Sequence, residues 1–152
     1  MDDDARLALL DALIYADGFD CALTTTEIAR GARLPIDAAQ IERLLTEDGP
    51  LRDVTSARGG FVTLRGRESL IDERPARIER AQALQVRARR AARVAARAPF
   101  VRGLALTGSL AASDARPGAD ADLLVIVEPG RLASVFLILG SLSRLYGRRV
   151  CP

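Results

Sequence analysis

The stretch 103-GLALTGSLAASDARPGADADLLVIV-127 decides how the C-terminal part of the chain is interpreted. It holds two apolar runs, which are separated by a segment rich in Ala, Asp, Gly and Ser. This pattern predicts a strand over 101–109, a loop or short helix, and a second strand over 121–127 that is buried on both faces. An apolar helix over 131–146 and the start of another strand over 148–152 would follow, giving an α/β arrangement with a mixed sheet.

Residues with a shared chemistry stand where the two predicted strands meet the loop. Gly108 and Ser109 end the first strand, and Asp120 and Asp122 begin the second. Residues two apart on a strand point to the same side, so the two carboxylates would lie roughly 6–7 Å apart and could share hard divalent cations such as Mg²⁺. A glycine lets a phosphate approach the backbone closely, and the serine adds a hydroxyl. These residue types indicate one site, with phosphates on the Gly-Ser turn and metal on the aspartates.

This pattern resembles the nucleotidyltransferase superfamily, whose fold DNA polymerase β and the minimal nucleotidyltransferases share. The resemblance rests on an apolar strand, Gly-Ser, a spacer of about ten residues and Asp-x-Asp between apolar residues, and it covers about residues 100–152. It implies that Gly108 and Ser109 hold the β- and γ-phosphates of a nucleoside triphosphate (NTP) such as ATP. It also implies that Asp120 and Asp122 are catalytic and ligate two Mg²⁺ ions during nucleotidyl transfer to an unknown hydroxyl acceptor.

The carboxylates depart from the family pattern in one respect. Active members bring a third carboxylate from a later strand, whereas this sequence has no Asp or Glu after Glu128. We therefore expect either that the chain is a fragment of a longer protein, which we favour, or that its catalytic set is incomplete. Both alternatives retain nucleotide binding, and they differ in whether this chain by itself catalyses nucleotidyl transfer.

Three helices and then two strands are expected in the N-terminal part. Leucine spacing predicts a helix over 5–16. Two capping boxes, in which a short polar residue is followed three residues later by Glu or Gln, predict helices that begin after Thr24 and after Asp37. Strands over 51–56 and 61–66 would form a hairpin, because two glycines between them supply the positive φ of a tight turn.

This order of elements resembles a winged helix-turn-helix, with 27-EIARGARLP-35 as the helix and turn, over about residues 5–66. The resemblance implies an alternative function, a DNA-binding transcriptional regulator that keeps a vestigial nucleotidyltransferase fold. Charge argues against sequence-specific DNA recognition, because residues 24–48 carry a net charge of −2 and DNA is a polyanion. The wing is basic, and Arg58 and Arg65 are its candidate nucleic-acid contacts. The other alternative is a scaffold module that binds a protein partner or dimerises.

An arginine-rich helix is expected between the two parts. Its apolar stripe follows Pro75, which suits a first helical position, and Pro99 closes it. Arg90, Arg93 and Arg97 share one face at helical spacing and are candidate contacts to the phosphates of DNA or tRNA. The alternative is that these arginines are solvated.

Composition excludes several chemistries. The 152 residues include no His, which excludes an imidazole base and His-ligated metals, and every basic residue is Arg, which excludes a Walker-A or Schiff-base lysine. Residues 1–75 carry a net charge of −6 and residues 76–152 one of +8, which suggests two units with different partners. The acidic start lacks the basic region of a signal peptide, and two cysteines do not suggest a disulfide scaffold, so we expect a cytoplasmic protein.

The expected organisation is a winged helix over 1–70, a connector helix over 71–99 and an incomplete nucleotidyltransferase-like domain over 100–152, in the α+β class. The apolar helix over 131–146 is short for a membrane span, so no membrane partner is expected. Its uncovered face would favour a homodimer. The leading function is Mg²⁺-dependent NTP binding and nucleotidyl transfer.

Overall fold

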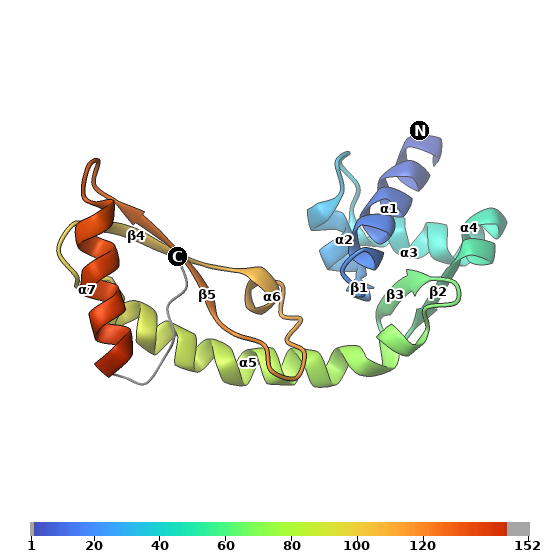
Figure 1. Ribbon diagram of the computed structural model, residues 1–152. Helices are drawn as coiled ribbons and strands as arrows, with labels where there is room; N and C mark the ends of the chain where they lie inside the picture. The colour runs from blue at the N-terminus through green and yellow to red at the C-terminus, as the bar shows by residue number, and fades with distance from the viewer. Residues whose placement is uncertain (1, 146–152) are drawn as a thin grey trace. The chain divides into compact units, whose positions relative to one another are not determined.

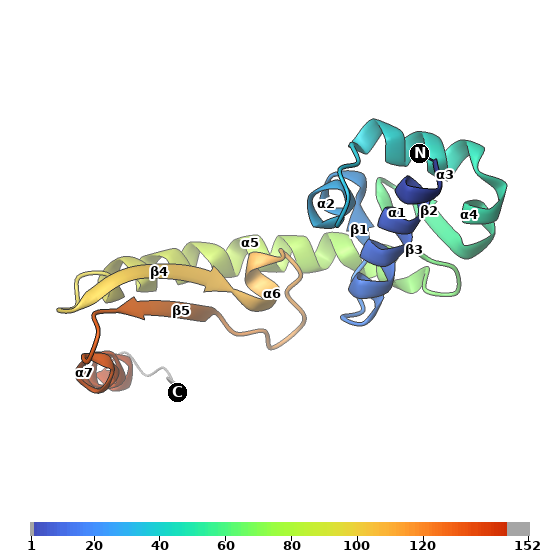
Figure 2. The same ribbon diagram turned by 90° about the horizontal axis from the view of Figure 1, so that it is seen from above.

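The computed structural model describes residues 2–145, and the chain divides into two compact units, Met1–Ala76 (unit 1) and Arg77–Pro152 (unit 2). Figures 1 and 2 show the ribbon from two directions. The chain combines helices with two small sheets, which confirms the predicted α+β class. The division falls inside helix α5 (Ser69–Ala95), within the segment that the sequence assigns to a connector.

Unit 1 packs short helices around an antiparallel sheet with the strand order β1-β3-β2. Its helices are α1 (Asp2–Asp17), α2 (Thr25–Gly31), α3 (Ala38–Glu47) and α4 (Gly49–Val54), and its strands are β1 (Leu23–Thr24), β2 (Thr55–Arg58) and β3 (Phe61–Leu64). The first residues of α5 also belong to this unit.

Helices α2 and α3 begin at the predicted capping boxes. Glu27 N donates a hydrogen bond to Thr24 Oγ1 (3.1 Å), and Thr24 N donates one to the Glu27 carboxylate (2.8 Å). Asp37 and Gln40 make the equivalent reciprocal pair, at 2.7 and 3.0 Å. The first backbone N–H groups of a helix have no partner within it, and here the capping side chains accept hydrogen bonds from them. The predicted helix starts after Thr24 and after Asp37 are therefore confirmed.

The strand predicted over 51–56 is wrong over residues 51–54. Residues Gly49–Val54 form α4, and β2 begins only after them. Leu51 N donates a hydrogen bond to the Asp48 carboxylate (3.2 Å), and Pro50 lies in the first turn, where it has no helical hydrogen bond to lose. The Gly-Pro pair therefore starts a new helix as well as ending α3.

The predicted hairpin forms between β2 and β3. Gly59 and Gly60 adopt φ angles of +60° and +82°, and the flanking Arg58 and Phe61 are paired. Positive φ at both turn residues matches the twist of the two strands. The sequence did not predict β1, which has only two residues but pairs with β3 and completes the sheet.

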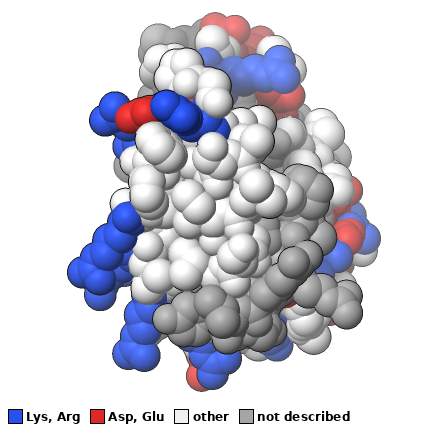
Figure 3. Space-filling model, turned by 60° about the vertical axis from the view of Figure 1, so that its left-hand side comes forward, with Lys and Arg blue, Asp and Glu red and all other residues white. Residues whose placement is uncertain are grey.

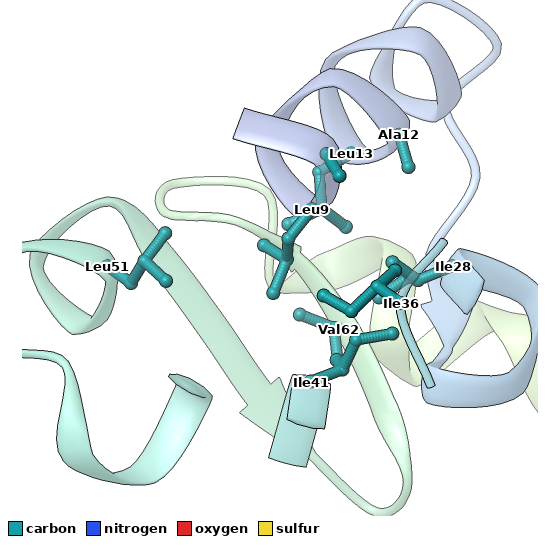
Figure 4. Close-up of a cluster of buried hydrophobic side chains, with 9 residues drawn as sticks. Leu9, Ala12, Leu13, Ile28, Ile36, Ile41, Leu51 and Val62 are labelled. Atoms are coloured by element: carbon teal, nitrogen blue, oxygen red, sulfur yellow. The ribbon is translucent and has the colours of Figure 1, made fainter. Parts of the chain in front are cut away.

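The hydrophobic core of unit 1 is drawn from helices α1 to α4 and from β3. Leu9, Ile28 and Ile41 are fully buried there, and Leu51 and Val62 lie in the same cluster (Figure 4). Burial of each such side chain contributes about 1.5–3 kcal/mol to the stability of the unit, so this cluster is what packs the small helices against the sheet.

Helix α5 begins and ends earlier than predicted. It spans Ser69–Ala95, so Pro75 lies inside the helix instead of at its first position, and the helix stops before Pro99. Leu70 and Ile71 are buried in a small cluster of unit 1, which stabilises the helical turn before the proline. Pro75 removes only one backbone hydrogen bond at that place.

Unit 2 contains the remainder of α5 and an antiparallel strand pair. Its other elements are β4 (Val101–Thr107), α6 (Gly108–Ala111), β5 (Asp122–Val127) and α7 (Leu132–Leu145). The order of strand, short helix, strand and helix is as predicted. All strand pairs among residues 2–145 are antiparallel, so the mixed sheet is not seen there, and the strand predicted over 148–152 lies outside the described residues.

Strand β5 is not buried on both faces, which corrects the prediction from its apolar run. Exposure alternates along it, and Leu124 and Ile126 are each 55% exposed. Leu132 and Leu137 of α7 are also exposed, and Figure 3 shows a broad surface with few charged side chains on the side where α7 lies. None of the helices within residues 2–145 combines the length and apolarity that a bilayer crossing requires.

Candidate functional site

The pairing of β4 with β5 brings the two halves of the sequence motif together. Thr107, the last residue of β4, is paired with Asp122, the first residue of β5. The Thr107 hydroxyl also donates a hydrogen bond to the Asp122 carbonyl oxygen (3.3 Å). Gly108 follows Thr107 directly, so the glycine and the aspartate lie at the same end of the strand pair (Figure 1).

Gly108 and the Asp122 side chain are in close contact. Gly108 adopts a φ of +68°, a backbone conformation that L side chains rarely adopt. A Cβ at this position would overlap Asp122 Oδ2 and would stand 3.3 Å from Asp122 Cγ. Two independent reasons therefore require glycine here: the positive φ, and the Asp122 carboxylate oxygen that occupies the place of a Cβ.

Ser109 follows Gly108 directly, and Asp120 precedes Asp122 by two residues; both side chains are exposed. Ser109 is exposed at the start of α6, and its carbonyl oxygen accepts a hydrogen bond from Asp114 N (2.8 Å). Asp120 lies two residues before β5 begins, so the expectation that Asp120 and Asp122 project from one strand is wrong. Both carboxylates are exposed, which leaves them accessible to a cation from solvent.

The donor set of the site is small. Within residues 2–145 no three or more His, Cys, Asp or Glu side chains are grouped so that they could hold a metal ion. Mg²⁺ is commonly bound through one or two carboxylates, with substrate phosphates and water completing its coordination. Asp120 and Asp122 are exposed carboxylates of the type that binds Mg²⁺ together with a nucleotide, and Asp122 Oδ2 occupies the place that a Gly108 Cβ would take.

Glu128, the last carboxylate of the sequence, lies away from this site. It follows the far end of β5, six residues after Asp122, which places it ~20 Å along the strand. Its side chain forms an ion pair with Arg102. Glu128 is therefore engaged elsewhere and does not extend the donor set.

Sequence reasoning missed the contacts that hold the segment between Ser109 and Asp120. Arg77 of α5 forms an ion pair with Asp114 (3.3 Å), and each residue is only 7% exposed. The Arg80 guanidinium donates to the Ala115 carbonyl oxygen (2.6 Å). No local pattern signals such pairs, because their members are 35 or more residues apart.

The arginines that were candidates for nucleic-acid contacts have different surroundings. Arg58 forms an ion pair with Asp72, and Arg65 donates hydrogen bonds to the carbonyl oxygens of Arg52 and Asp53. Arg52, Arg58 and Arg65 line an open hollow of about 360 Å³ in unit 1.

The candidates from the connector are arranged differently from the prediction. Arg90 and Arg93 are exposed on α5, but Arg97 lies beyond the last residue of that helix. The three therefore do not share one helical face. The early end of α5, in the turn before Pro99, is the reason.

Glu68, which also lines the hollow, is held in its ionised form. Its carboxylate accepts hydrogen bonds from Ser56 Oγ (2.6 Å) and from Gly66 N (3.0 Å). The bond from Ser56, followed by that from Gly66, lowers the pKa of Glu68 from 4.5 to about 2. The hollow thus contains one fixed negative charge among its three arginines.

Comparison with protein families gives one match. Residues 89–149 match the nucleotidyltransferase domain. This match supports the nucleotidyltransferase superfamily for that segment, and with it a general function in nucleotidyl transfer. Domains of this kind generally use an NTP and a divalent metal ion. Comparisons with curated proteins and with solved structures found no match.

Proposed function

We propose that unit 2 binds the triphosphate of an NTP together with Mg²⁺ and serves nucleotidyl transfer to a hydroxyl acceptor. The observation that carries this proposal is the contact between Gly108 and the Asp122 carboxylate at the joined ends of β4 and β5. The family match over residues 89–149 supports the same reaction class. ATP is the first nucleotide to test.

Each residue has a role that follows from its chemistry. The backbone at Gly108 and the hydroxyl of Ser109 bind the β- and γ-phosphates at the turn, next to the Asp122 carboxylate that fills the place of a Gly108 Cβ. Asp120 and Asp122 hold Mg²⁺ through their carboxylate oxygens. When bound, Mg²⁺ offsets the negative charge that gathers on the phosphates.

The proposed reaction exchanges one bond for another at the α-phosphorus of the nucleotide. The acceptor oxygen forms a bond to that phosphorus, the bond to the bridging oxygen breaks, pyrophosphate leaves and one proton is released. In this scheme the chain's own residues position the triphosphate for attack, and positioning together with charge stabilisation makes up most of what a protein contributes to this class of reaction.

Nucleotide binding can be tested by calorimetric titration of the chain with ATP in the presence and absence of Mg²⁺. We expect binding that requires Mg²⁺ and that is lost in Asp120→Asn and in Asp122→Asn. The matched control is Glu79→Gln, which makes the same charge change at an exposed position of α5 and should bind ATP like the unmodified chain. Magnesium-independent binding that survives both aspartate changes would contradict the proposal.

Unit 1 supports a second candidate function. We infer that it is a winged helix that contacts duplex DNA. Helices α1 to α3, the sheet β1-β3-β2 and the glycine turn of the hairpin support this interpretation, as does the gathering of Arg52, Arg58 and Arg65 around one hollow.

DNA binding by unit 1 can be tested by fluorescence anisotropy with a labelled duplex over a salt series. We expect Arg58→Gln and Arg65→Gln to weaken binding and to reduce the slope against log salt by about 1 for each phosphate that the variant no longer neutralises. Arg131→Gln, which removes one exposed positive charge from unit 2, is the control and should change neither quantity. Equal weakening in all three variants would indicate a general charge effect instead.

A further inference from the structure

The spacer, residues 110–119, which joins the Gly-Ser turn to the Asp-x-Asp pair, is docked on one stripe of helix α5. The stripe recurs at intervals of three and four residues, which places its members on one side of a helix. It consists of Arg77, Arg80, Ala81, Leu84, Gln85 and Ala88. All of these residues belong to unit 2. The apolar ones lie in a hydrophobic cluster with Leu106, Leu110, Ala115 and Ala119, and the polar ones contact residues between Leu110 and Ala115.

Apolar packing forms the middle of this docking surface. Ala81 and Ala88 of α5 are buried, as are Leu110 and Ala115 of the spacer. The alanines of the stripe leave no long side chain between helix and spacer, so the backbone of the spacer can come close to α5. Close approach then allows polar side chains of the helix to reach spacer carbonyl oxygens.

Polar contacts attach the spacer along its length. Gln85 Nε2 donates to the carbonyl oxygen of Leu110 (2.7 Å), the residue after Ser109. Arg77 pairs with Asp114 in a buried position (3.3 Å), and Arg80 donates to the carbonyl oxygen of Ala115 (2.6 Å).

The ion pair sits in the middle of the spacer. Asp114 lies five residues after Ser109 and six before Asp120, and its own N–H donates to the Ser109 carbonyl oxygen (2.8 Å). Anchoring Asp114 divides the connection between Ser109 and Asp120 into two shorter segments. A shorter segment allows its ends a smaller range of positions. A buried ion pair also favours one geometry, because each buried charge is stabilised by the opposite charge beside it.

We propose that Asp114, through its buried ion pair with Arg77, is a positioning residue that holds Gly108-Ser109 and Asp120 in the arrangement that binds Mg²⁺ and NTP. Asp114 does not touch the nucleotide in this proposal. It acts by fixing the spacer between the phosphate-binding turn and the metal-binding carboxylates. This inference rests on the proposed nucleotide-binding function of unit 2.

The test compares Asp114→Asn with Glu27→Gln. Glu27 pairs with the buried Arg74 in unit 1 (2.8 Å), so Glu27→Gln also removes the charge of an acid from a buried arginine but lies outside the spacer. We expect Asp114→Asn to bind Mg²⁺·ATP about 10- to 100-fold more weakly, the range found when a partner that orients a metal ligand is removed. Glu27→Gln should bind Mg²⁺·ATP with the affinity of the unmodified chain, even if its thermal unfolding midpoint falls as much as that of Asp114→Asn.

Amide hydrogen exchange without nucleotide supplies a second readout. In Asp114→Asn the spacer amides should exchange faster, while those in the middle of β4 and β5 keep their protection. Where Asp114→Asn fails to fold, Gln85→Ala removes a milder contact of the same stripe and should still weaken Mg²⁺·ATP binding.

The outcomes separate this inference from the proposed function. If the unmodified chain binds Mg²⁺·ATP and Asp114→Asn binds it equally well, the positioning role is overturned although the nucleotide site stands. If Asp114→Asn and Glu27→Gln lose affinity to the same extent, the effect is general destabilisation and the positioning role is also overturned. If the unmodified chain binds no nucleotide, the proposed function itself fails.

Discussion

Replacing Gly108 by alanine is expected to abolish nucleotide binding while unit 2 stays folded. The substitution has two costs. At a φ of +68° an alanine is disfavoured by roughly 1–2 kcal/mol, and its Cβ would overlap Asp122 Oδ2. The overlap can be relieved only by moving the Asp122 carboxylate or the backbone of the turn, and either movement disturbs the proposed metal and phosphate ligands.

Gly118→Ala separates these two costs. Gly118 lies in the segment that joins α6 to β5, at a φ of +82°, but a Cβ there has no atom within 4 Å. It should therefore lose a similar roughly 1–2 kcal/mol of stability, equivalent to about 4–8 °C in Tm per kcal/mol for a unit of this size, without touching Asp122. The two variants are matched in backbone strain and differ in the contact with the carboxylate.

The assay is a titration with Mg²⁺·ATP alongside thermal unfolding. We expect both variants to unfold at lower temperature and only Gly108→Ala to lose binding. Equal affinity in Gly108→Ala and the unmodified chain would show that the Gly108–Asp122 contact is not part of the nucleotide site. Equal loss of binding in both variants would attribute the effect to strain in the loop.

Three further predictions concern stability and titration. Leu110→Ala should cost about 2–5 kcal/mol in urea unfolding of unit 2, because the buried alanines around it cannot fill the cavity. Thr24→Ala should cost about 1 kcal/mol in the same assay on unit 1, since it breaks the capping box with Glu27. Ser56→Ala should raise the pKa of Glu68 from about 2 toward 4.5, as measured by NMR titration of that carboxyl. The lowered pKa of Glu68 stabilises the fold above pH about 4.5, and this contribution is lost as the pH falls toward about 2. Ser56→Ala should therefore lose less stability on acidification than the unmodified chain. An unchanged pKa of Glu68 in this variant would exclude the hydrogen bond from Ser56 as the cause.

Local signals in the sequence predicted local structure well. The capping boxes at Thr24 and Asp37 predicted two helix starts, because donor and acceptor are only three residues apart. The glycine pair predicted the hairpin turn for the same reason. The Gly-Pro pair before Leu51 is compatible both with the end of one helix and with the start of the next, so it does not distinguish the predicted strand from the helix α4.

Features that depend on distant residues could not be predicted. The apolar run of β5 hides its period of two, so the sequence suggested burial on both faces although Leu124 and Ile126 are exposed. The early start of α5 depends on Leu70 and Ile71 packing into unit 1. For the site, spacing predicted that Gly108 and Asp122 converge, and the structure places them in contact. The pair of Arg77 with Asp114 joins residues 37 positions apart and has no local signature.

The most direct test of the nucleotide site is to replace Mg²⁺ by paramagnetic Mn²⁺ and follow the broadening of assigned NMR signals as ATP is added. We predict that the signals of Gly108, Ser109, Asp120 and Asp122 broaden first, and that ATP strengthens the effect. The proposed nucleotide site would be contradicted if the signals of these four residues stayed sharp. It would also be contradicted if the broadening centred on the acidic residues of unit 1 and did not change when ATP was added.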